Sequence, residues 1–176
     1  TEDEIKRIMA HEFDNPTLAL VRDLFIFACF TALSFVDMKE LTTDEIVEVN
    51  GEKWILSKRH KTNVPFQVKL LDIPLQIIER YKYLSEDRLV FGKINYWTMC
   101  KQLKKVMAEC GIEKQISYHC ARHTFGTLAL SKGMPIESVS RVLGHTNIVT
   151  TQIYAKITTQ KLDNDLTMFG LSLIHI

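Results

Sequence analysis

Residues 46–70 read IVEVNGEKWILSKRHKTNVPFQVKL, and this stretch decides the fold class of the chain. Asn50-Gly51 separates two short runs rich in β-branched and aromatic residues, which is the strongest short-range signal of a hairpin. The pattern predicts strands over Ile46–Val49 and Lys53–Leu56.

A third strand is predicted after a polar turn at Ser57–Asn63, because apolar and polar residues then alternate with a period of two. Its apolar side chains share one parity: Val64, Phe66, Val68 and Leu70. The three runs together predict a small three-stranded antiparallel sheet.

Helical patterns flank this sheet on both sides. The stretch that begins at Pro16 is apolar almost all round up to Leu33, so we expect a buried central helix there. The predicted helices are Thr1–Ala10, Pro16–Leu33, Phe35–Glu40, Leu75–Leu84, Tyr96–Cys110, His119–Lys132, Pro135–Leu143, Asn147–Tyr154 and Thr159–Met168. The expected fold is a mostly helical α+β domain over residues 1–169. The apolar, unpatterned tail 170–176 is either a docking segment or a foreign end.

Composition excludes several classes of protein. The 176 residues are 46% hydrophobic and 24% charged, which is typical of a globular domain and not of a disordered, collagen-like or coiled-coil chain. The longest apolar stretch, Leu24–Leu33, is too short to span a membrane. The four cysteines show no CxxC spacing, which indicates reduced thiols in a cytoplasmic protein.

The net charge is only +1, from 22 Lys+Arg against 21 Asp+Glu, whereas nucleic-acid-binding proteins are usually more basic. The distribution is less even, since acidic residues dominate the first 50 positions. Basic residues gather later, at Lys53, Lys58, Arg59, Lys61, Lys101, Lys104 and Lys105. These clusters are either solvated surface charges or a basic face for DNA.

One predicted helix carries a polar face that could bind an anion. His119, Arg122 and His123 recur at helical spacing, away from the apolar stripe that begins at Ala121. Arginine presents a fork of donors that matches phosphate oxygens, and histidine adds a donor or a proton shuttle. The alternative is a solvated helix face. A zinc pair is not favoured, because Cys120 stands where a zinc-protease helix would carry glutamate.

Two further segments contain candidate residues. Gly144 is suited to end a helix in the left-handed conformation and would project His145 from it, with Tyr154 later in the same segment. Arg59 and Lys61 would point to the same side if their segment were extended. Each feature on its own is also typical of an ordinary surface or packing residue.

The order of these features is more specific than any one of them. Lys61 before a strand, then His119-x-x-Arg122-His123, then Leu143-Gly144-His145, then Tyr154, resembles the catalytic domain of the tyrosine recombinases, or phage-type integrases. The resemblance covers about residues 17–157 and implies the fold of that domain. It also implies that the N-terminal DNA-clamping domain of such enzymes is absent from this chain.

The resemblance implies site-specific cleavage and rejoining of DNA through a 3′-phosphotyrosyl intermediate, with neither metal nor cofactor. By the same resemblance, Tyr154 is the nucleophile and Lys61 the general acid, while His119 assists proton transfer. Arg122 and His145 bind the non-bridging phosphate oxygens. Asp37 supports the pocket, and the DNA contacts fall to Lys58, Arg59, Lys101, Lys104 and Lys105.

One position departs from the family pattern. The segment concerned is Thr31-Ala32-Leu33-Ser34. The family usually has its first arginine at the position of Ser34 and a glycine at the position of Ala32. We expect Arg59 to substitute for that arginine. Integrases of mobile elements from Bacteroides-type bacteria commonly lack it too, which favours an active enzyme of that branch.

Several functions remain open on this pattern. The leading prediction is an integrase of a mobile element or prophage. The others are a catalytically weak DNA-binding accessory relative, a chromosome-dimer resolvase of the same family, and a helical interaction domain with an accidental match. The expected partners are double-stranded DNA, further copies of the chain in a tetramer on DNA, and accessory DNA-bending proteins. The isolated domain is expected to be a monomer, with Lys161–Met168 as the segment exchanged between protomers.

Overall fold

The computed structural model of the chain describes residues 1–84, 88–155 and 159–174. Two predicted features lie partly outside them. These are the Lys161 side chain of the proposed exchange segment and the last two positions, 175–176, of the predicted tail.

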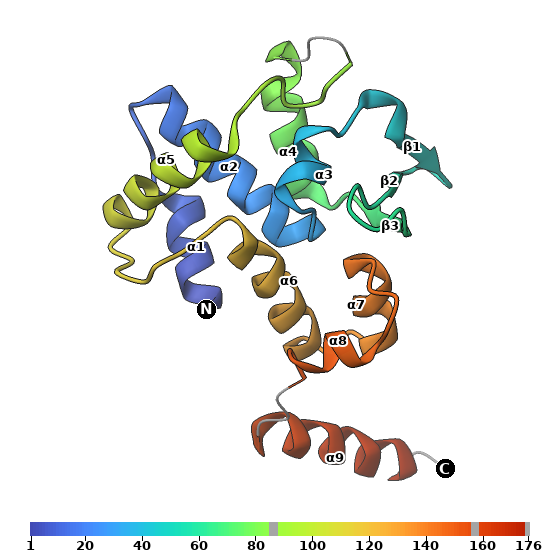
Figure 1. Ribbon diagram of the computed structural model, residues 1–176. Coiled ribbons are helices and arrows are strands. Elements are labelled where there is room, and N and C mark those ends of the chain that lie inside the picture. Colours follow the sequence, from blue (N-terminus) through green and yellow to red (C-terminus); the bar gives the residue numbers. More distant parts are fainter. Residues whose placement is uncertain (85–87, 156–158, 175–176) are drawn as a thin grey trace.

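Helix α2 (Pro16–Thr31) forms the centre of the helical part, as its apolar sequence predicts (Figure 1). The Asn15 side chain accepts hydrogen bonds from the first turn, and Pro16 occupies the position where proline is favourable. Four helices pack on α2: α1 (Glu2–Ala10), α4 (Asp72–Tyr81), α5 (Tyr96–Glu109) and α6 (His119–Ser131). Phe27 and Leu24 are fully buried there, so this layer holds most of the core.

The helical layer also contains a buried carboxylate, Asp23, which was not predicted from the sequence. Asp23 is 4% exposed and accepts hydrogen bonds from Arg80 at 2.7 Å and from the Tyr81 hydroxyl at 2.8 Å. A buried charge is tolerated only when it is paired in this way. The contact joins α4 to α2.

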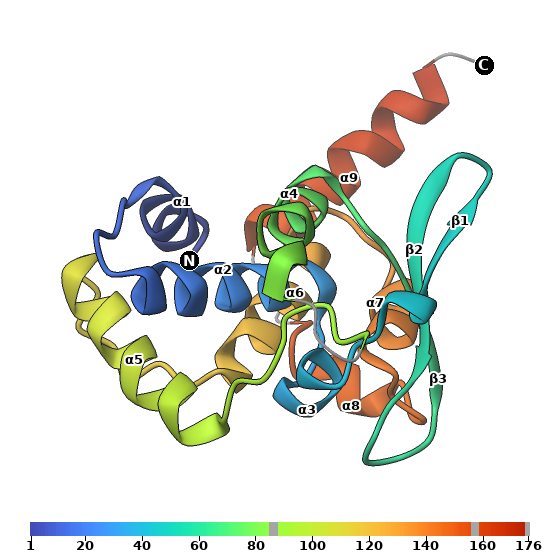
Figure 2. The same cartoon turned by 90° about the horizontal axis from the view of Figure 1, so that it is seen from above.

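The sheet has the predicted order and direction. Strands β1 (Ile46–Val49), β2 (Glu52–Lys58) and β3 (Pro65–Lys69) are antiparallel neighbours in that order. Asn50 and Gly51 have φ of 53° and 79°, which the tight hairpin turn requires. Helix α7 (Ile136–Leu143) packs against β3 (Figure 2), so the sheet is joined to the helical part from the C-terminal half of the chain.

The helix ends show where the prediction and the structure differ. Helix α4 begins at Asp72, before the predicted start at Leu75, because Pro74 fits the first turn where its missing N–H is not needed. Helix α8 covers only Val149–Gln152, less than the predicted Asn147–Tyr154. Helix α9 runs over Thr159–Ile174, so the predicted unpatterned tail is helical up to Ile174.

The remaining elements are short: α3 (Phe35–Lys39) and the 3-10 turns η1 (Thr43–Glu45) and η2 (Lys82–Leu84). Helix α9 stands outside the packed body in Figure 1. Its exposed apolar side chains are Leu162, Leu166, Met168, Phe169 and Leu171. Among the described residues, no helix is both long and apolar enough to cross a membrane.

Candidate active site

Arg59 lies in the structure as a buried cation, at the start of the turn between β2 and β3. Its side chain is 6% exposed, and its Nη1 donates to Asp37 Oδ2 at 2.8 Å. The guanidinium lies 3.8 Å from the centre of the Phe66 ring, and Nη2 donates to the Val142 carbonyl at 2.5 Å. Burial lowers the pKa of Arg59, and the bond with Asp37 opposes that shift.

Asp37 gathers donors from three directions. Besides Arg59, it accepts from the Ser34 hydroxyl at 2.8 Å and from the His60 amide at 2.9 Å. Burial alone would raise the pKa of Asp37, but the bonds from His60, Arg59 and Ser34 outweigh burial and lower it. Arg59 and Ser34 donate to the same oxygen, so the guanidinium lies beside the position from which the family's first arginine is missing.

Arg122, on α6, is held by backbone carbonyls. Its Nη1 donates to the Ala32 carbonyl at 2.9 Å, and its Nη2 donates to the Leu143 carbonyl. Ala32 has φ of 57° and ends α2, so it adopts the left-handed conformation that the usual glycine would favour. Burial first, and then the charge of Arg59, lower the pKa of Arg122 to about 10, which leaves it protonated at neutral pH.

The end of α7 brings the two arginines together. Arg59 binds the carbonyl of Val142 and Arg122 binds that of Leu143, so both cap the negative end of one helix. We call Arg59, Arg122 and Asp37 the arginine cluster. In the part of the chain that the structure describes, no carboxylate forms an ion pair with Arg122. The cluster therefore keeps a positive charge that an anion could balance.

Gly144 permits this arrangement for two reasons. Its φ is 62°, and a Cβ at this position would lie 2.8 Å from Arg59 Nε. After this turn, His145 Nδ1 lies 2.9 Å from the buried Thr151 hydroxyl, which leaves Nε2 as the ring atom for a ligand. Burial, then the charges of Arg122 and Arg59, lower the pKa of His145, so the ring is neutral at pH 7.

His119 and His123 form a pair on α6, with ring centres 4.5 Å apart and planes at 89°. Burial, then the neighbouring His123 and Arg122, lower the pKa of His119. The His123 ring also lies 5.4 Å from the Tyr154 ring, so it stands between His119 and Tyr154. The lowered pKa favours the neutral form of His119, which is able to accept a proton.

Tyr154 packs on α6 through a glycine. A Cβ on Gly126 would lie 2.9 Å from Tyr154 Cδ2, so the ring rests directly on the helix backbone. The Tyr154 amide donates to the Thr151 carbonyl at 3.1 Å. Burial raises the pKa of Tyr154, and the charge of Arg122 opposes that shift.

Lys61 lies in the turn that the sequence predicts after Ser57. The segment from Arg59 to Lys61 is not extended, so the condition under which the two side chains would share one side is not met. Arg59 is buried, whereas Lys61 is exposed at the tip of the turn. The five residues predicted to contact DNA also differ in exposure. Arg59 is buried, whereas four are exposed: Lys58, Lys101, Lys104 and Lys105.

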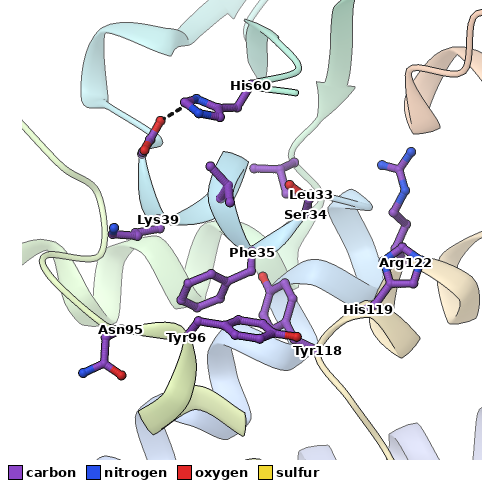
Figure 3. Close-up of a pocket in the computed structure, with 12 residues that line it drawn as sticks. Leu33, Ser34, Phe35, Lys39, His60, Asn95, Tyr96, Tyr118, His119 and Arg122 are labelled. Atoms are coloured by element: carbon purple, nitrogen blue, oxygen red, sulfur yellow. Dashed lines mark ion pairs between the residues drawn. The ribbon is translucent and has the colours of Figure 1, made fainter. Parts of the chain in front are cut away.

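A pocket of about 630 Å³ opens beside this cluster (Figure 3). Ser34, His119 and Arg122 line one end of it, and Tyr96 and Tyr118 belong to its aromatic wall. No role was predicted from the sequence for Tyr118, Thr151 or Gly126. The signal for Gly126 was present, because a glycine inside a helix costs about 1 kcal/mol against alanine and so needs a reason.

The arrangement suits a reaction on a phosphodiester. Two guanidiniums and two imidazoles lie near one another here, and the Tyr154 ring packs beside His123. Donors fixed by backbone contacts can stabilise negative charge that develops on phosphate oxygens without reorganising. In the described residues, no three His, Cys, Asp or Glu side chains are placed to hold a metal ion.

Comparison with known proteins places the chain in a family. Residues 1–161 match the model of the phage integrase family, and the chain belongs to that family of tyrosine-type site-specific recombinases. Tyrosine recombinase XerA of Pyrococcus horikoshii is 30% identical over 173 residues, which are 92% of this chain and 58% of that protein. The chain therefore spans a little over half the length of this relative.

Solved structures share the fold. XerH site-specific recombinase, in a post-cleavage complex with palindromic difH substrate, has a TM-score of 0.75 at 22% identity over 96% of this chain and 51% of that one. The Tn1549 transposon integrase in complex with a circular intermediate DNA has a TM-score of 0.71 at 16% identity, over 95% and 63%. The expected mostly helical fold with a three-stranded antiparallel sheet is confirmed.

Proposed function

We propose that this chain is the catalytic domain of an enzyme that cuts and rejoins DNA through a covalent phosphotyrosyl link. The observation that carries the proposal is the arginine cluster, with Tyr154 and two neutral histidines around it. Membership of the recombinase family supports it.

In the proposed reaction, the Tyr154 hydroxyl attacks the phosphorus of one DNA strand. The bond from Tyr154 Oη to phosphorus forms, and the bond from phosphorus to the 5′-oxygen breaks. Lys61 gives a proton to the departing 5′-oxygen, and the Tyr154 proton passes to the His119–His123 pair, in which the His123 ring lies 5.4 Å from the Tyr154 ring. The 5′-hydroxyl of a partner strand then reverses these steps.

The arginine cluster binds the non-bridging oxygens in this proposal. Arg122 and His145 are the proposed donors to these oxygens, and Arg59 supplies the charge that Ser34 does not. Asp37 positions Arg59. Each fixed donor of this kind contributes about 3–4 kcal/mol to the stabilisation of the transition state.

Two biological roles within the family are candidates for this chain. Ser34 favours an integrase of a mobile element of the Bacteroides type, and the Tn1549 transposon integrase and XerH both share the fold of this chain. The identity with XerA favours the second candidate, a chromosome-dimer resolvase. Circular intermediate DNA and a paired chromosomal site, offered as competing substrates, distinguish the two.

Double-stranded DNA is the proposed partner, contacted by Lys58, Lys101, Lys104 and Lys105 on the exposed surface. The exposed apolar side chains of α9 support its exchange between protomers in a tetramer on DNA. A domain that binds mainly through phosphates should lose affinity steeply as salt increases.

The test is a covalent trap with nicked duplex DNA. Because the target site is not known, duplexes are first recovered from a randomised pool by their retention on the protein. The wild-type chain should give an SDS-stable protein–DNA band, and Tyr154→Phe should give none while it still shifts DNA in a gel. Bound DNA without any covalent band from the wild type would favour the accessory DNA-binding relative.

A further inference from the structure

The pocket beside the arginine cluster extends well beyond the groups that the proposed reaction uses. Ser34, His119 and Arg122 form one end of it. From there it reaches Tyr96 at the start of α5 and Lys39 at the end of α3 (Figure 3). Its volume of about 630 Å³ is in the range of small-molecule sites and is large enough for a nucleoside.

Three aromatic rings form its apolar wall. The Phe35 ring lies 5.1 Å from that of Tyr96 and 5.5 Å from that of Tyr118, both in edge-on geometry. Phe35 and Tyr118 are buried, whereas Tyr96 is 53% exposed. Of these three rings, Tyr96 therefore offers the exposed aromatic surface to a ligand, with Phe35 and Tyr118 packed behind it. Nucleobases stack on such surfaces whatever their sequence.

The Tyr118 hydroxyl has no partner in this wall. The residue is 2% exposed, and its Oη is buried without a hydrogen bond. An unsatisfied buried hydroxyl costs about 1–3 kcal/mol, so its presence needs an explanation. Burial holds the pKa of Tyr118 well above its ordinary value, so the group stays protonated and can donate.

The rim opposite the cluster is polar. The Lys39 side chain is exposed there, and His60 Nδ1 lies 2.9 Å from Glu40 Oε2. The Glu40 carboxylate is therefore turned toward His60. The pocket thus runs from one cationic end, at Arg122, past an aromatic wall to a second cation, at Lys39.

We propose that this pocket receives the nucleotide next to the scissile phosphate. Its base lies against Tyr96, and Lys39 faces the following phosphate. The Tyr118 hydroxyl, which is closed to solvent in the free protein, becomes a donor to the base when the nucleotide enters. The inference rests on the proposed function, because Arg122 and His119 must hold the scissile phosphate for its neighbour to reach this pocket. Among the ligands that the pocket could take, a nucleotide alone is covalently joined to a phosphate at Arg122.

The first test combines a protein variant with a DNA variant in a double-mutant cycle. The measured quantity is the rate of covalent attachment to nicked duplexes recovered from the randomised pool. Tyr96→Ala should slow attachment about 10- to 100-fold. An abasic residue next to the scissile phosphate should slow the wild-type protein similarly. The two changes together should cost no more than either alone. Tyr118→Phe, which removes only the hydroxyl, should cost about 3- to 10-fold. Tyr83→Ala, an exposed tyrosine elsewhere, is the matched control.

The second test needs no cleavage. The fluorescence of 2-aminopurine, placed next to the scissile phosphate, should change when Tyr154→Phe protein binds the duplex, and Tyr96→Ala in that background should remove the change. If covalent attachment occurs but neither test depends on Tyr96 or Tyr118, the pocket proposal is wrong and the proposed activity stands. A Tyr96-dependent fluorescence change without covalent attachment by the wild-type chain would support the pocket and overturn the activity.

Discussion

Arg59 and Lys61 stand two positions apart in the chain but in opposite surroundings. Arg59 is buried, and Asp37 and the Val142 carbonyl bind its guanidinium. Lys61 is exposed at the tip of the same turn. In the proposed reaction the groups that bind phosphate are fixed before DNA arrives, whereas the group that gives up a proton is held at the surface. Binding benefits from preorganisation, and a proton donor must meet its substrate.

The largest effect should come from the exposed side of this comparison. Lys61→Ala should slow covalent attachment by about 100- to 10,000-fold, because the leaving 5′-oxygen loses its general acid. The free energy of unfolding should stay within about 0.5 kcal/mol of the wild type, since the residue is exposed. Urea denaturation and the trap measure the two quantities.

A sulfur substitution in the DNA sharpens this prediction. A duplex with sulfur in place of the bridging 5′-oxygen has a leaving group that needs no proton, since a thiol is far more acidic than an alcohol. It should restore most of the rate of Lys61→Ala and none of that of Arg122→Ala. Equal rescue of both variants would contradict the role of Lys61.

Replacing the buried residue, Arg59, should lower both the rate of covalent attachment and the free energy of unfolding. Arg59→Ala should slow attachment about 100- to 1,000-fold through the loss of one phosphate donor. It should also lower the free energy of unfolding by about 3 kcal/mol, because Asp37 remains buried without its cation. Asp37→Asn in the same background should recover part of the stability but none of the rate. Attachment at the wild-type rate by Arg59→Ala would show that Arg59 does not substitute for the missing arginine.

The substitution Gly126→Ala tests the packing of the proposed nucleophile, Tyr154, on α6. A Cβ there would lie 2.9 Å from Tyr154 Cδ2, so the ring must shift. We expect attachment to slow about 10-fold or more, because a misplacement of about 1 Å can cost that much. Stability should not fall by more than about 1 kcal/mol, since alanine favours the helix. Gly170→Ala, with nothing within 4 Å of its Cβ, is the control for helix propensity. An unchanged rate would mean that Tyr154 moves away from Gly126 before it reacts.

The smallest effect concerns the pH dependence of stability. The folded protein lowers the pKa values of His119 and His145 below the ordinary value of 6.5. The unfolded chain then binds protons more readily, so the free energy of unfolding should fall as the pH decreases below about 6.5. Replacing both residues by glutamine should flatten this slope in urea denaturation between pH 5 and 7. An identical slope in the double variant would contradict the burial of these rings.

Local features explain what the sequence could predict of the fold. Asn50-Gly51 sets the hairpin because both residues adopt positive φ, and the apolar run in α2 leaves burial as the stable placement. The ends of α4 and α8 were less accurate, since a helix boundary depends on which caps and contacts are available.

The sequence by itself determined the α+β class, the sheet order and the family pattern that runs from Lys61 to Tyr154, because these depend on periodicity and on residue type. Only the tertiary structure decided that Arg59 turns inward to Asp37 while Lys61 turns out, and that Tyr154 rests on Gly126. It also decided that the Tyr118 hydroxyl is buried without a hydrogen-bond partner. The physical reason is that each of these contacts joins residues far apart in the chain, where no local propensity acts.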